Sequence, residues 1–469
     1  MALWKLAKRI KRLDGSASKA DISRRLRRAS ERLGPTFIKL GQIISSGEGV
    51  FPPELVSEFR KCRDQVPAED FDDIRRIVEE DLGRPLREIF YTFDSKPLAA
   101  ASIAQVHRAE LKIHGEPVEV VVKVQRPDIA ERIHADIAAT AWLAPFLVGR
   151  IPVAALANPP ALVEVFAQSI VEELDFRLEA ENMLDVARSL EQLGQTGYVV
   201  PRPHPRLVTK RVLVMERLDG FQFDDIERLE AEGIDPHEIV RTGMVGFLEG
   251  AMVNGIFHGD LHGGNLFVRP DGRTALLDYG IVGRLTEPKR IAFLKMMMNA
   301  MSNNVKGQVE AIRDLGALPD DVDIDKVIVD LGLDGNAADP MQMTQDELVE
   351  EVNRLVKAML GYGARMPREL MLFAKNLVFI EGMIAALTPD LDLFAEIQHI
   401  AMWFLKRHGN QLAADIGIKT DDFGIDLTAI KGQFGVDPAT EEFTYRELQE
   451  RRETIARRFA GRENDRPAV

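Results

Sequence analysis

Three polar residues in one short stretch have the types and spacing that phosphoryl transfer requires. Asp260 precedes Asn265 by five residues in HGDLHGGN, and Asp278 opens the tripeptide Asp278, Tyr279, Gly280. An aspartate can orient or accept the proton of an attacking hydroxyl, while an asparagine and a second aspartate supply hard oxygen ligands for Mg²⁺. We therefore predict Asp260 as a catalytic residue and Asn265 and Asp278 as metal ligands. Gly280 is expected to let the backbone turn so that the Asp278 carboxylate faces the phosphates.

The segments around these residues favour a built site over a solvated loop. The runs LFV and TALLDY are rich in strand-forming residues and are separated by the turn residues Pro270, Asp271 and Gly272. This hairpin would set Asn265 at its start and Asp278 at its end. The same order of aspartate, asparagine, hairpin and aspartate is found in the protein-kinase fold.

A site of this kind needs a lysine that pairs the nucleotide phosphates. Lys123 lies in VEVVVKVQ, a predicted strand, and an ammonium group in the middle of a buried strand needs a carboxylate partner. The alternative is an edge-strand lysine whose head reaches water. A predicted long helix offers five acidic candidates that spacing alone does not separate: Glu172, Glu173, Asp175, Glu179 and Glu181.

The usual glycine-rich phosphate loop is replaced by small residues. The predicted nucleotide-binding loop is Ala99, Ala100, Ala101, Ser102, Ile103, Ala104, Gln105 and Val106. Small side chains allow backbone N–H groups to approach phosphate, but alanine forbids the positive-φ conformations open to glycine, so this loop is expected to be stiffer. By position, Met215, Glu216 and Leu218 would contact the adenine.

The elements that must position these residues follow from periodicity. Residues 20–87 predict several short helices, the chain from Ile89 predicts a strand pair with a turn near His114 and Gly115, and residues 160–193 predict a long helix. YVV and RVLVMERL predict strands on either side of a proline-rich turn. Beyond Gly280 the pattern is almost wholly helical, with a loop-like acidic stretch at about 316–345, and MPRELMLFAKNLVFIEGMIAAL predicts a core helix.

Composition narrows the class of protein. The chain has 469 residues, 45% hydrophobic and 29% charged, which is typical of a soluble globular enzyme. The formal net charge of −14 argues against nucleic acid as a partner. One cysteine, Cys62, excludes an intramolecular disulfide and a cysteine metal site, so a cytoplasmic location is expected.

The N-terminus differs in charge from the rest. Residues 1–32 carry a net +8, which leaves −22 for the remainder. Leu3, Leu6, Ile10 and Leu13 recur at helical spacing among lysines and arginines, a pattern typical of a helix on an anionic membrane surface. The alternative is a basic helix docked on the acidic body. The apolar segment 137–171 is interrupted by prolines and is not expected to span a bilayer.

The segment after Asp278 is short. Seven residues, IVGRLTE, separate Gly280 from Pro288, where the next helix is predicted to begin. A protein kinase needs a longer activation segment to dock a peptide, so a protein substrate is not expected.

Several motifs together resemble the UbiB-type atypical kinase family, also called the aarF-domain family. FIKLGQ carries the residues Lys39, Gly41 and Gln42 of its KxGQ motif, and Glu173 and Asp175 match its ExD motif. The alanine-rich loop replaces the glycine loop as it does in that family. The resemblance covers about residues 20–400.

The resemblance implies an α+β, protein-kinase-like fold of two lobes, with a small antiparallel sheet lobe, a large helical lobe and an N-terminal helical extension. It further implies that Glu179 pairs with Lys123, that Glu173 pairs with Lys39, and that Lys39, Gln42, Glu173 and Asp175 are regulatory. The implied domains are a basic segment 1–32, an extension 33–88, an N-lobe 89–218, a C-lobe 219–435 and a tail 436–469.

The expected function is that of a Mg·ATP-dependent kinase or ATPase acting in, or regulating, isoprenoid-quinone or related lipid metabolism. Lys123, Glu179 and Asp260 would be the catalytic residues, and ATP and Mg²⁺ the cofactors. The acceptor would be a small or lipid-like molecule or water. Peripheral contact with the inner membrane face through residues 1–32 is expected, since the C-terminal membrane helices of many members are absent. HGDLHGGN, in place of the common HADPHPGN, keeps open a small-molecule phosphotransferase, and an ATP-gated scaffold for lipid-synthesis enzymes is a further alternative.

Overall fold

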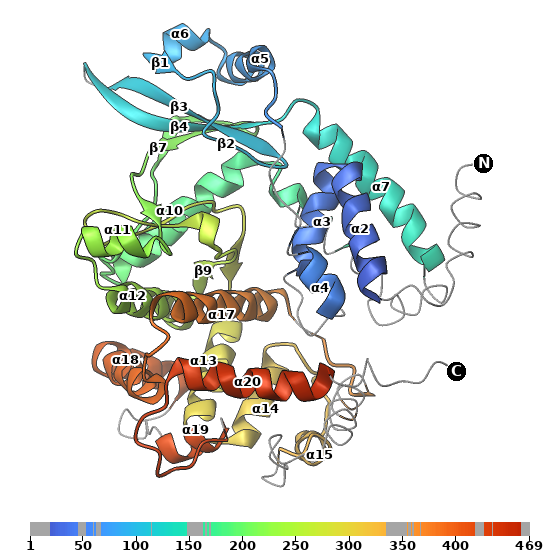
Figure 1. Cartoon of the computed structure of the whole chain (residues 1–469), viewed down its shortest axis with the longest axis vertical. Coiled ribbons are helices and arrows are strands. Elements are labelled where there is room, and N and C mark those ends of the chain that lie inside the picture. The colour runs from blue at the N-terminus through green and yellow to red at the C-terminus, as the bar shows by residue number, and fades with distance from the viewer. Residues whose placement is uncertain are drawn as a thin grey trace. The chain divides into compact units, whose positions relative to one another are not determined.

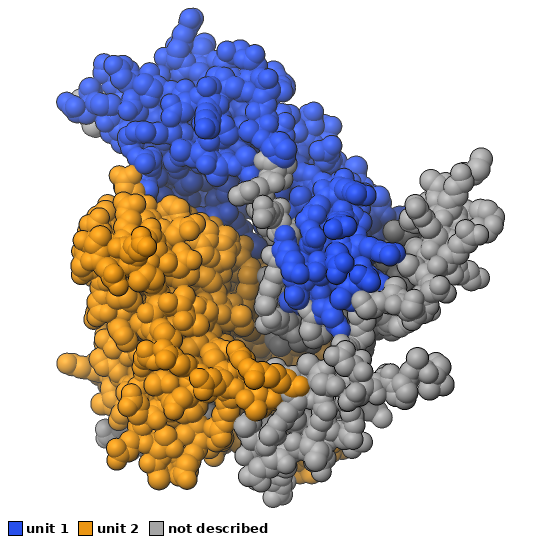
Figure 2. Space-filling model, viewed as in Figure 1, with its two compact units in different colours: residues 1–185, 201–218, 278–281 blue, residues 186–200, 219–277, 282–469 orange. Residues whose placement is uncertain are grey.

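The architecture is described from a computed structural model. It covers residues 19–45, 53–59, 61, 67–113, 115–147, 163–164, 167, 170–333, 354, 358, 361–365, 367–417, 426–433 and 435–460. These residues form an α+β fold of helices and mainly antiparallel sheets (Figure 1). The chain divides into two compact units (Figure 2): unit 1 is Met1–Asp185, Pro201–Leu218 and Asp278–Ile281, and unit 2 is Val186–Val200, Asp219–Leu277 and Val282–Val469.

In the sequence of unit 1, several helices precede the strands of the sheet, and a further helix lies between β4 and β6. Its elements are α2 (Lys19–Leu33), α3 (Pro35–Ser45), α4 (Pro53–Phe59), α5 (Phe71–Leu82), α6 (Leu86–Ile89), β1 (Thr92–Phe93), β2 (Ala99–Ala100), β3 (Ala104–Ile113), β4 (Glu116–Gln125), α7 (Ile129–Leu147), β6 (Pro203–Val208) and β7 (Val212–Glu216). Helix α10 (Phe176–Gln192) begins in unit 1 and ends in unit 2.

The sheet of unit 1 is antiparallel, and β7 and β6, from later in the chain, extend it beyond β4. Its strand order is β1-β3-β4-β7-β6, with β2 paired to β3. In β4, alternate residues face opposite sides, so Val120, Val122 and Val124 are buried while Lys123 points the other way. The valines pack with Ile74 of α5 in one hydrophobic core. The strand thereby delivers Lys123 to the face of the sheet opposite α5.

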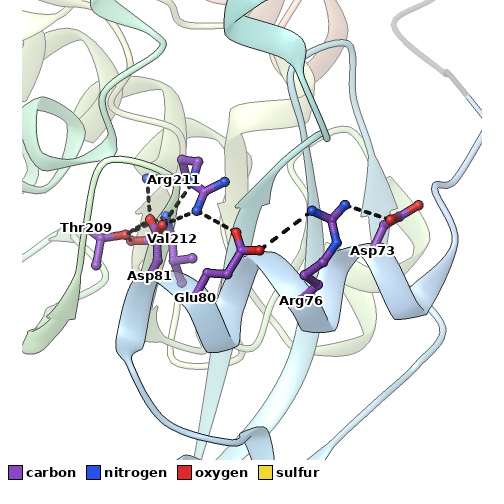
Figure 3. Close-up of polar contacts among 7 residues, drawn as sticks. All are labelled: Asp73, Arg76, Glu80, Asp81, Thr209, Arg211 and Val212. Atoms are coloured by element: carbon purple, nitrogen blue, oxygen red, sulfur yellow. Dashed lines mark hydrogen bonds and ion pairs between the residues drawn. The ribbon is translucent and has the colours of Figure 1, made fainter.

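Polar contacts fasten α5 to the turn between β6 and β7 (Figure 3). The carboxylate of Asp81 accepts hydrogen bonds from Thr209 Oγ1 at 2.6 Å and from Arg211 Nε at 2.8 Å. Arg211 also donates to Glu80 at 3.1 Å, and Glu80 lies 3.7 Å from Arg76. Helix α5 begins with the side chain of Asp70 accepting from the N–H of the second helical residue and ends at a left-handed glycine. This chain of contacts fixes the helix against the back of the sheet.

Helices α2, α3 and α4 pack against one another, and α3 also contacts α7. Thr36 of α3 donates to Asp136 of α7 at 2.6 Å. Arg27 of α2 binds Glu58 of α4 at 3.2 Å. This small helical group therefore has its own polar and apolar contacts within unit 1.

Unit 2 is mostly helical. Its elements are β5 (Tyr198–Val199), β8 (Phe221–Gln222), α11 (Ile226–Ala231), α12 (Pro236–Glu249), the π-helix η1 (Gly250–Asn254), β9 (Ile256–His258), the 3₁₀ helix η2 (Gly263–Asn265), β10 (Leu266–Val268), β11 (Thr274–Leu276), β12 (Val282–Arg284), α13 (Glu287–Met301), α14 (Val305–Asp314), α15 (Ile324–Asp330), α17 (Arg368–Leu387), α18 (Leu393–Ile416), α19 (Leu427–Gln433) and α20 (Tyr445–Ala460).

The predicted hairpin is present as β10 and β11, which pair antiparallel with Leu266 opposite Leu276. Gly272 in the turn has φ of 79°, a value that favours glycine. Strand β8 extends this sheet on one side and β5 pairs parallel on the other. The sheet holds the loop that carries Asp260 and Asn265.

An aromatic cluster joins the helices behind this loop. The ring of Phe373 from α17 stacks on Phe247 of α12 at 4.8 Å and meets Phe257 of β9 edge-on at 5.9 Å and Phe293 of α13 at 4.6 Å. Buried aromatic pairs of this kind add to the stabilisation from apolar burial. They make α17 a core helix of unit 2, as its sequence predicts.

Helix α17 is also long and apolar enough to cross a membrane by length and composition, with 33% of its most apolar window buried. No other helix among the described residues meets that test. Its packing against α12 and its buried Phe373 and Asn376 fit the core of a folded unit. Helix α17 therefore combines a face packed within unit 2 with an apolar composition that meets the criteria for a membrane-spanning helix.

Some local predictions differ from the structure. Residues 203–208, predicted as part of a proline-rich turn, form the edge strand β6, where prolines are tolerated because one side of the strand has no ladder to join. The acidic stretch contains the short helix α15, which begins with Asp323 accepting from Lys326 N–H. The long helix predicted over 160–193 is interrupted at 173–175. Residues 1–18 of the predicted membrane-binding segment lie outside the described residues.

Candidate functional site

The predicted site residues are divided between the two units. In unit 1, Lys123 of β4 meets Glu179 in the first turn of α10, with Nζ 2.8 and 2.9 Å from the two carboxylate oxygens. Glu179 is 5% exposed and Lys123 16%. Of the five acidic candidates, the structure therefore brings Glu179 to the strand lysine.

Asp278 joins the same cluster. Its Oδ1 lies 3.4 Å from Lys123 Nζ and accepts the N–H of Gly280 at 3.1 Å. The sequence predicts that glycine provides the turn, but the positive φ of 57° is at Asp278 itself. Gly280 matters for space instead, because a Cβ there would come within 3.3 Å of Asp278 Oδ1. The strained backbone at a polar residue is a common mark of a functional position.

Electrostatics keep this cluster charged. Burial alone would lower the pKa of Lys123, but the negative charges of Asp278 and Glu179 outweigh it and raise that pKa above its ordinary value. Burial raises the pKa of Glu179, and Lys123 opposes this shift. Lys123 contacts both oxygens of Glu179, so the two side chains form a close ion pair. A fixed ammonium group beside an exposed carboxylate is suited to holding phosphate oxygens.

The alanine-rich loop is a tight hairpin between β2 and β3. Ala101 N–H donates to Ala104 O at 2.8 Å, and Arg126 holds the turn by donating from Nε to Ala101 O at 2.8 Å and from its backbone N–H to Ile103 O at 2.9 Å. The arginine is itself held by Glu69 at 2.5 Å. These hydrogen bonds hold the turn against Arg126, and the stiffness expected of alanine stays a prediction.

Two residues of the predicted loop have different surroundings. Val106 is partly buried and lies directly opposite Lys123 in the β3–β4 register, on the same face of the sheet. The side chain of Gln105 is fully buried elsewhere, where Oε1 accepts Glu69 N–H at 2.9 Å and Nε2 contacts His107 Nε2 at 2.9 Å. Its side chain is therefore committed to the fold, which leaves only its backbone for a nucleotide.

The predicted regulatory residues lie in the same unit. Lys39 of α3 lies 3.0 Å from Glu173, which sits in the turn before α10. Asp175 instead binds Arg177, whose hydrogen bonds at 2.5 and 2.9 Å lower the pKa of that carboxyl group. Gln42 is in α3, and its side chain is outside the described residues.

The predicted adenine-contacting residues are at the end of β7. Met215 and Glu216 belong to the strand and Leu218 follows it. The N–H of Glu216 donates to Arg202 O at 2.9 Å, so this donor is used within the sheet.

In unit 2, the loop between β9 and β10 carries Asp260 and Asn265. Asn265 is 6% exposed, and its Nδ2 donates to the backbone oxygen of Asp260 at 3.1 Å. This bond orients the amide so that Oδ1 is the atom offered to a ligand. A hard oxygen donor is what Mg²⁺ requires, so the donor chemistry of Asn265 fits that ion, as does the carboxylate of Asp278 in unit 1. No cluster of three or more His, Cys, Asp or Glu suited to a metal occurs among the described residues.

His258 supports the same loop from within. Its Nδ1 accepts the N–H of Asp260 at 3.1 Å, and its Nε2 lies 3.2 Å from Leu277 O. A ring that accepts at one nitrogen and donates at the other is neutral. The histidine thus links the loop to the end of β11, directly before Asp278.

Two residues outside every predicted motif also contact the loop. Lys375 forms an ion pair with Asp260, and Asn376 bonds to Leu261 N–H at 3.0 Å and to His258 O. Both come from α17, and Lys375 lies 115 residues beyond Asp260. The available signal was a lysine–asparagine pair inside the apolar run LMLFAKNLVFI, since buried polar groups need partners.

After Asp278 the chain forms β12, which pairs antiparallel with β9 in the register Val282 opposite His258. Helix α13 then begins at Glu287. The short segment predicted from sequence is therefore an ordered strand.

Comparison with known proteins identifies the family to which this chain is similar. The ABC1 atypical kinase-like domain matches residues 61–312. An uncharacterized aarF domain-containing protein kinase of the chloroplast from Arabidopsis thaliana is 32% identical over 412 residues, 81% of this chain and 75% of that protein. A probable protein kinase UbiB from Aliivibrio fischeri is 31% identical over 417 residues, 87% of this chain and 76% of that protein.

A solved structure, a Mycobacterium tuberculosis protein in complex with erythromycin, aligns with 74% of this chain and 86% of its own at 24% identity and a TM-score of 0.46. Family membership rests on the domain match, which covers more than half of the chain, and on the relatives. The chain belongs to the ABC1 atypical kinase-like family, the aarF and UbiB proteins.

Proposed function

We propose that this protein is a Mg·ATP-dependent phosphotransferase or ATPase that acts in, or regulates, isoprenoid-quinone or related lipid metabolism. The observation that carries the proposal is the cluster of Lys123, Glu179 and Asp278, in which a buried ionised pair holds an ammonium group beside an exposed carboxylate. The lipid pathway is supported by kinship with proteins named UbiB.

Each predicted site residue has a definite role in this proposal. Lys123, oriented by Glu179, would bind the α and β phosphates of ATP. The backbone of the alanine-rich hairpin would cover the phosphates, while the Glu216 carbonyl and the Leu218 N–H would contact the adenine edge. Asn265 and Asp278 would hold magnesium, which neutralises charge on the phosphates when bound.

Asp260 would orient the acceptor, whether water or a hydroxyl. The acceptor oxygen forms a bond to the γ-phosphorus, the bond from that phosphorus to the β–γ bridging oxygen breaks, and ADP leaves with the electron pair. The acceptor proton passes to Asp260 or to solvent. The ordered β12 after Asp278, in place of a long activation segment, favours a small or lipid-like acceptor or water over a peptide.

Membrane contact is part of the proposal. In α2, Ile22, Leu26 and Leu33 are 43%, 49% and 59% exposed, and they recur at helical spacing. Arg25, Arg28 and Arg32 are exposed beside them. An apolar stripe flanked by arginines suits the surface of an anionic bilayer, where both apolar burial and charge attraction contribute.

The test is ATP hydrolysis by the purified full chain, with and without vesicles of anionic phospholipid, beside Asp278→Asn. We expect magnesium-dependent turnover that the variant loses. Equal turnover in both proteins would refute the catalytic proposal and favour an ATP-gated scaffold. A rate and sedimentation that do not respond to vesicles would refute membrane contact.

The second candidate is a phosphotransferase for a soluble small molecule. The sequence HGDLHGGN in the catalytic loop favours it. Turnover that rises with a water-soluble alcohol or amine and yields a phosphorylated product, with no response to vesicles, would support this candidate over the first.

A further inference from the structure

Helix α17 contacts the catalytic loop through two consecutive residues. Asn376 Oδ1 accepts the N–H of Leu261 at 3.0 Å, and its Nδ2 donates to the carbonyl oxygen of His258. These two backbone groups lie on either side of Asp260 in the sequence. Lys375 completes the contact by pairing its ammonium group with the Asp260 carboxylate.

The two residues differ in burial, and this difference separates their roles. Asn376 is 0% exposed, so its amide is a connector that holds the loop backbone within the fold. The side chains of Lys375 and Asp260 are 26% and 20% exposed, so their ion pair is open to solvent on one side. Substrate or water can therefore reach the carboxylate while the lysine holds it.

The position of Lys375 is fixed by its neighbours in the helix. Phe373, two residues earlier, is packed in the aromatic cluster with Phe247, and Asn376 is bonded to the loop. With the backbone fixed at both points, Lys375 has a defined origin from which to reach Asp260. A charged residue whose support is set by buried packing is suited to preorganising a catalytic group.

We propose that Lys375 is a positioning residue for Asp260: it holds the carboxylate in the orientation that aligns the acceptor, and it balances that negative charge beside the nucleotide phosphates. This inference rests on the proposed function, because it concerns how Asp260 serves phosphoryl transfer. Loss of the lysine would remove the ammonium contact that orients the Asp260 carboxylate and would reduce the positive charge between that carboxylate and the nucleotide phosphates.

The experiment measures magnesium-dependent ATP turnover, nucleotide affinity and thermal midpoint of the full chain for Lys375→Met, Lys375→Arg, Asp260→Asn and the double variant Lys375→Met with Asp260→Asn. Lys375→Met is expected to lower kcat by about 100-fold, the scale of a misplaced catalytic group, with little change in nucleotide affinity. Lys375→Arg is expected to restore most of the rate. In the Asp260→Asn background the lysine substitution is expected to have no further effect.

A second ion pair made by α17 provides a matched control. Lys289 of α13 lies 3.1 Å from Glu369 in the first turn of α17. Lys289→Met removes a lysine–carboxylate pair of α17 and is expected to leave kcat unchanged.

The outcomes separate this inference from the proposed function. Equal turnover in wild type and Asp278→Asn would refute the proposed function itself. Turnover that depends on Asp278 but is the same in Lys375→Met would overturn the positioning role alone. A fall in thermal midpoint in Lys375→Met that accounts for the lost rate, or an additive effect in the double variant, would also overturn it, because either result indicates a structural role.

Discussion

Under the proposed function, the pairing of Lys123 with Glu179 determines how the lysine would bind a phosphate group. The two side chains are largely buried, and the lysine contacts both oxygens of the carboxylate. A buried charge of this kind persists only while its partner is present. Glu179 therefore sets the direction of the Lys123 ammonium group and, together with Asp278, maintains its charge.

Glu179→Gln tests this dependence. The substitution keeps the size of the side chain but removes its charge, so Lys123 loses its fixed orientation. We expect ATP turnover to fall by about 100-fold and the thermal midpoint to fall as well. Glu181→Gln, on an exposed position of the same helix, is the matched control and should leave both unchanged. Similar losses in the two variants would contradict the assigned role of Glu179.

Some individual residues could be predicted from sequence and others could not. Lys123 could be predicted because the alternation of side chains along a strand of valines places it on a definite face. Choosing Glu179 among its acidic neighbours required either family resemblance or the observed start of α10 at Phe176, because spacing alone leaves several faces open. Lys375 was missed because it lies in an apolar helix far along the chain from Asp260, and single-sequence patterns do not report long-range contacts.

Among the elements, α5 and the β6–β7 turn form one unit through Asp81 (Figure 3). Asp81→Asn weakens its bonds to Thr209 and Arg211, and we expect the unfolding free energy to fall by about 1–3 kcal/mol. Denaturant unfolding measures this loss. Asp73→Asn, which touches only the exposed pair with Arg76 at the other end of the helix, is expected to change stability little. A larger effect in Asp73→Asn would contradict the central role of Asp81.

Strand β3 carries a group that makes stability depend on pH. His107 is fully buried, and burial lowers its pKa below the ordinary 6.5. Its Nδ1 donates to Asp94 O at 2.8 Å and its Nε2 accepts from Gln105, so the folded state holds the neutral ring. The unfolded chain takes up the proton first as the pH falls.

The stabilising contribution of neutral His107 is therefore complete above about pH 6.5 and is lost as the pH falls toward the lowered folded pKa. The loss amounts to about 1.4 kcal/mol per pH unit in that window. His107→Gln should lack this component when unfolding is measured from pH 7 to 5, while the exposed control His134→Gln should follow the wild type. Parallel curves for all three proteins would contradict the assignment.

Local sequence patterns predicted some elements better than others. The β10–β11 hairpin was predicted because turn residues and strand formers agree there. Strand β6 was missed because its two prolines indicate a turn unless the strand is known to lie at an edge. The edge position of a strand is a property of the assembled sheet, so it cannot be predicted from the periodicity of the segment alone.

For the molecule as a whole, charge separates the N-terminal region from the acidic remainder. Replacing Arg25, Arg28 and Arg32 of α2 with glutamate should abolish co-sedimentation with anionic vesicles and leave ATP turnover without vesicles unchanged. The reason is that the exposed face would then repel the lipid surface. Vesicles of neutral lipid provide the matched control, and retained binding of the charge-reversed variant to anionic vesicles would contradict the prediction.

At this scale the α+β class and the family followed from motifs spread along the sequence, and the domain match agrees. The assignment of Asp278–Ile281 to unit 1 did not follow from those motifs, because these residues lie far downstream of the rest of that unit. A segment of four residues is too short to carry a sequence pattern that predicts the unit to which it belongs.

This downstream position of Asp278 has a consequence for synthesis on the ribosome. Lys123 and Asp278 are 155 residues apart, so at about 5–20 residues per second the lysine waits roughly 8–30 s for its second carboxylate to be translated. Glu179 is translated 56 residues after Lys123, so for the rest of that interval the nascent region has the lysine and Glu179 but lacks the aspartate that we propose as a metal ligand. Under the proposed function, ATP binding would therefore become available only after the segment that carries Asp278 has been made.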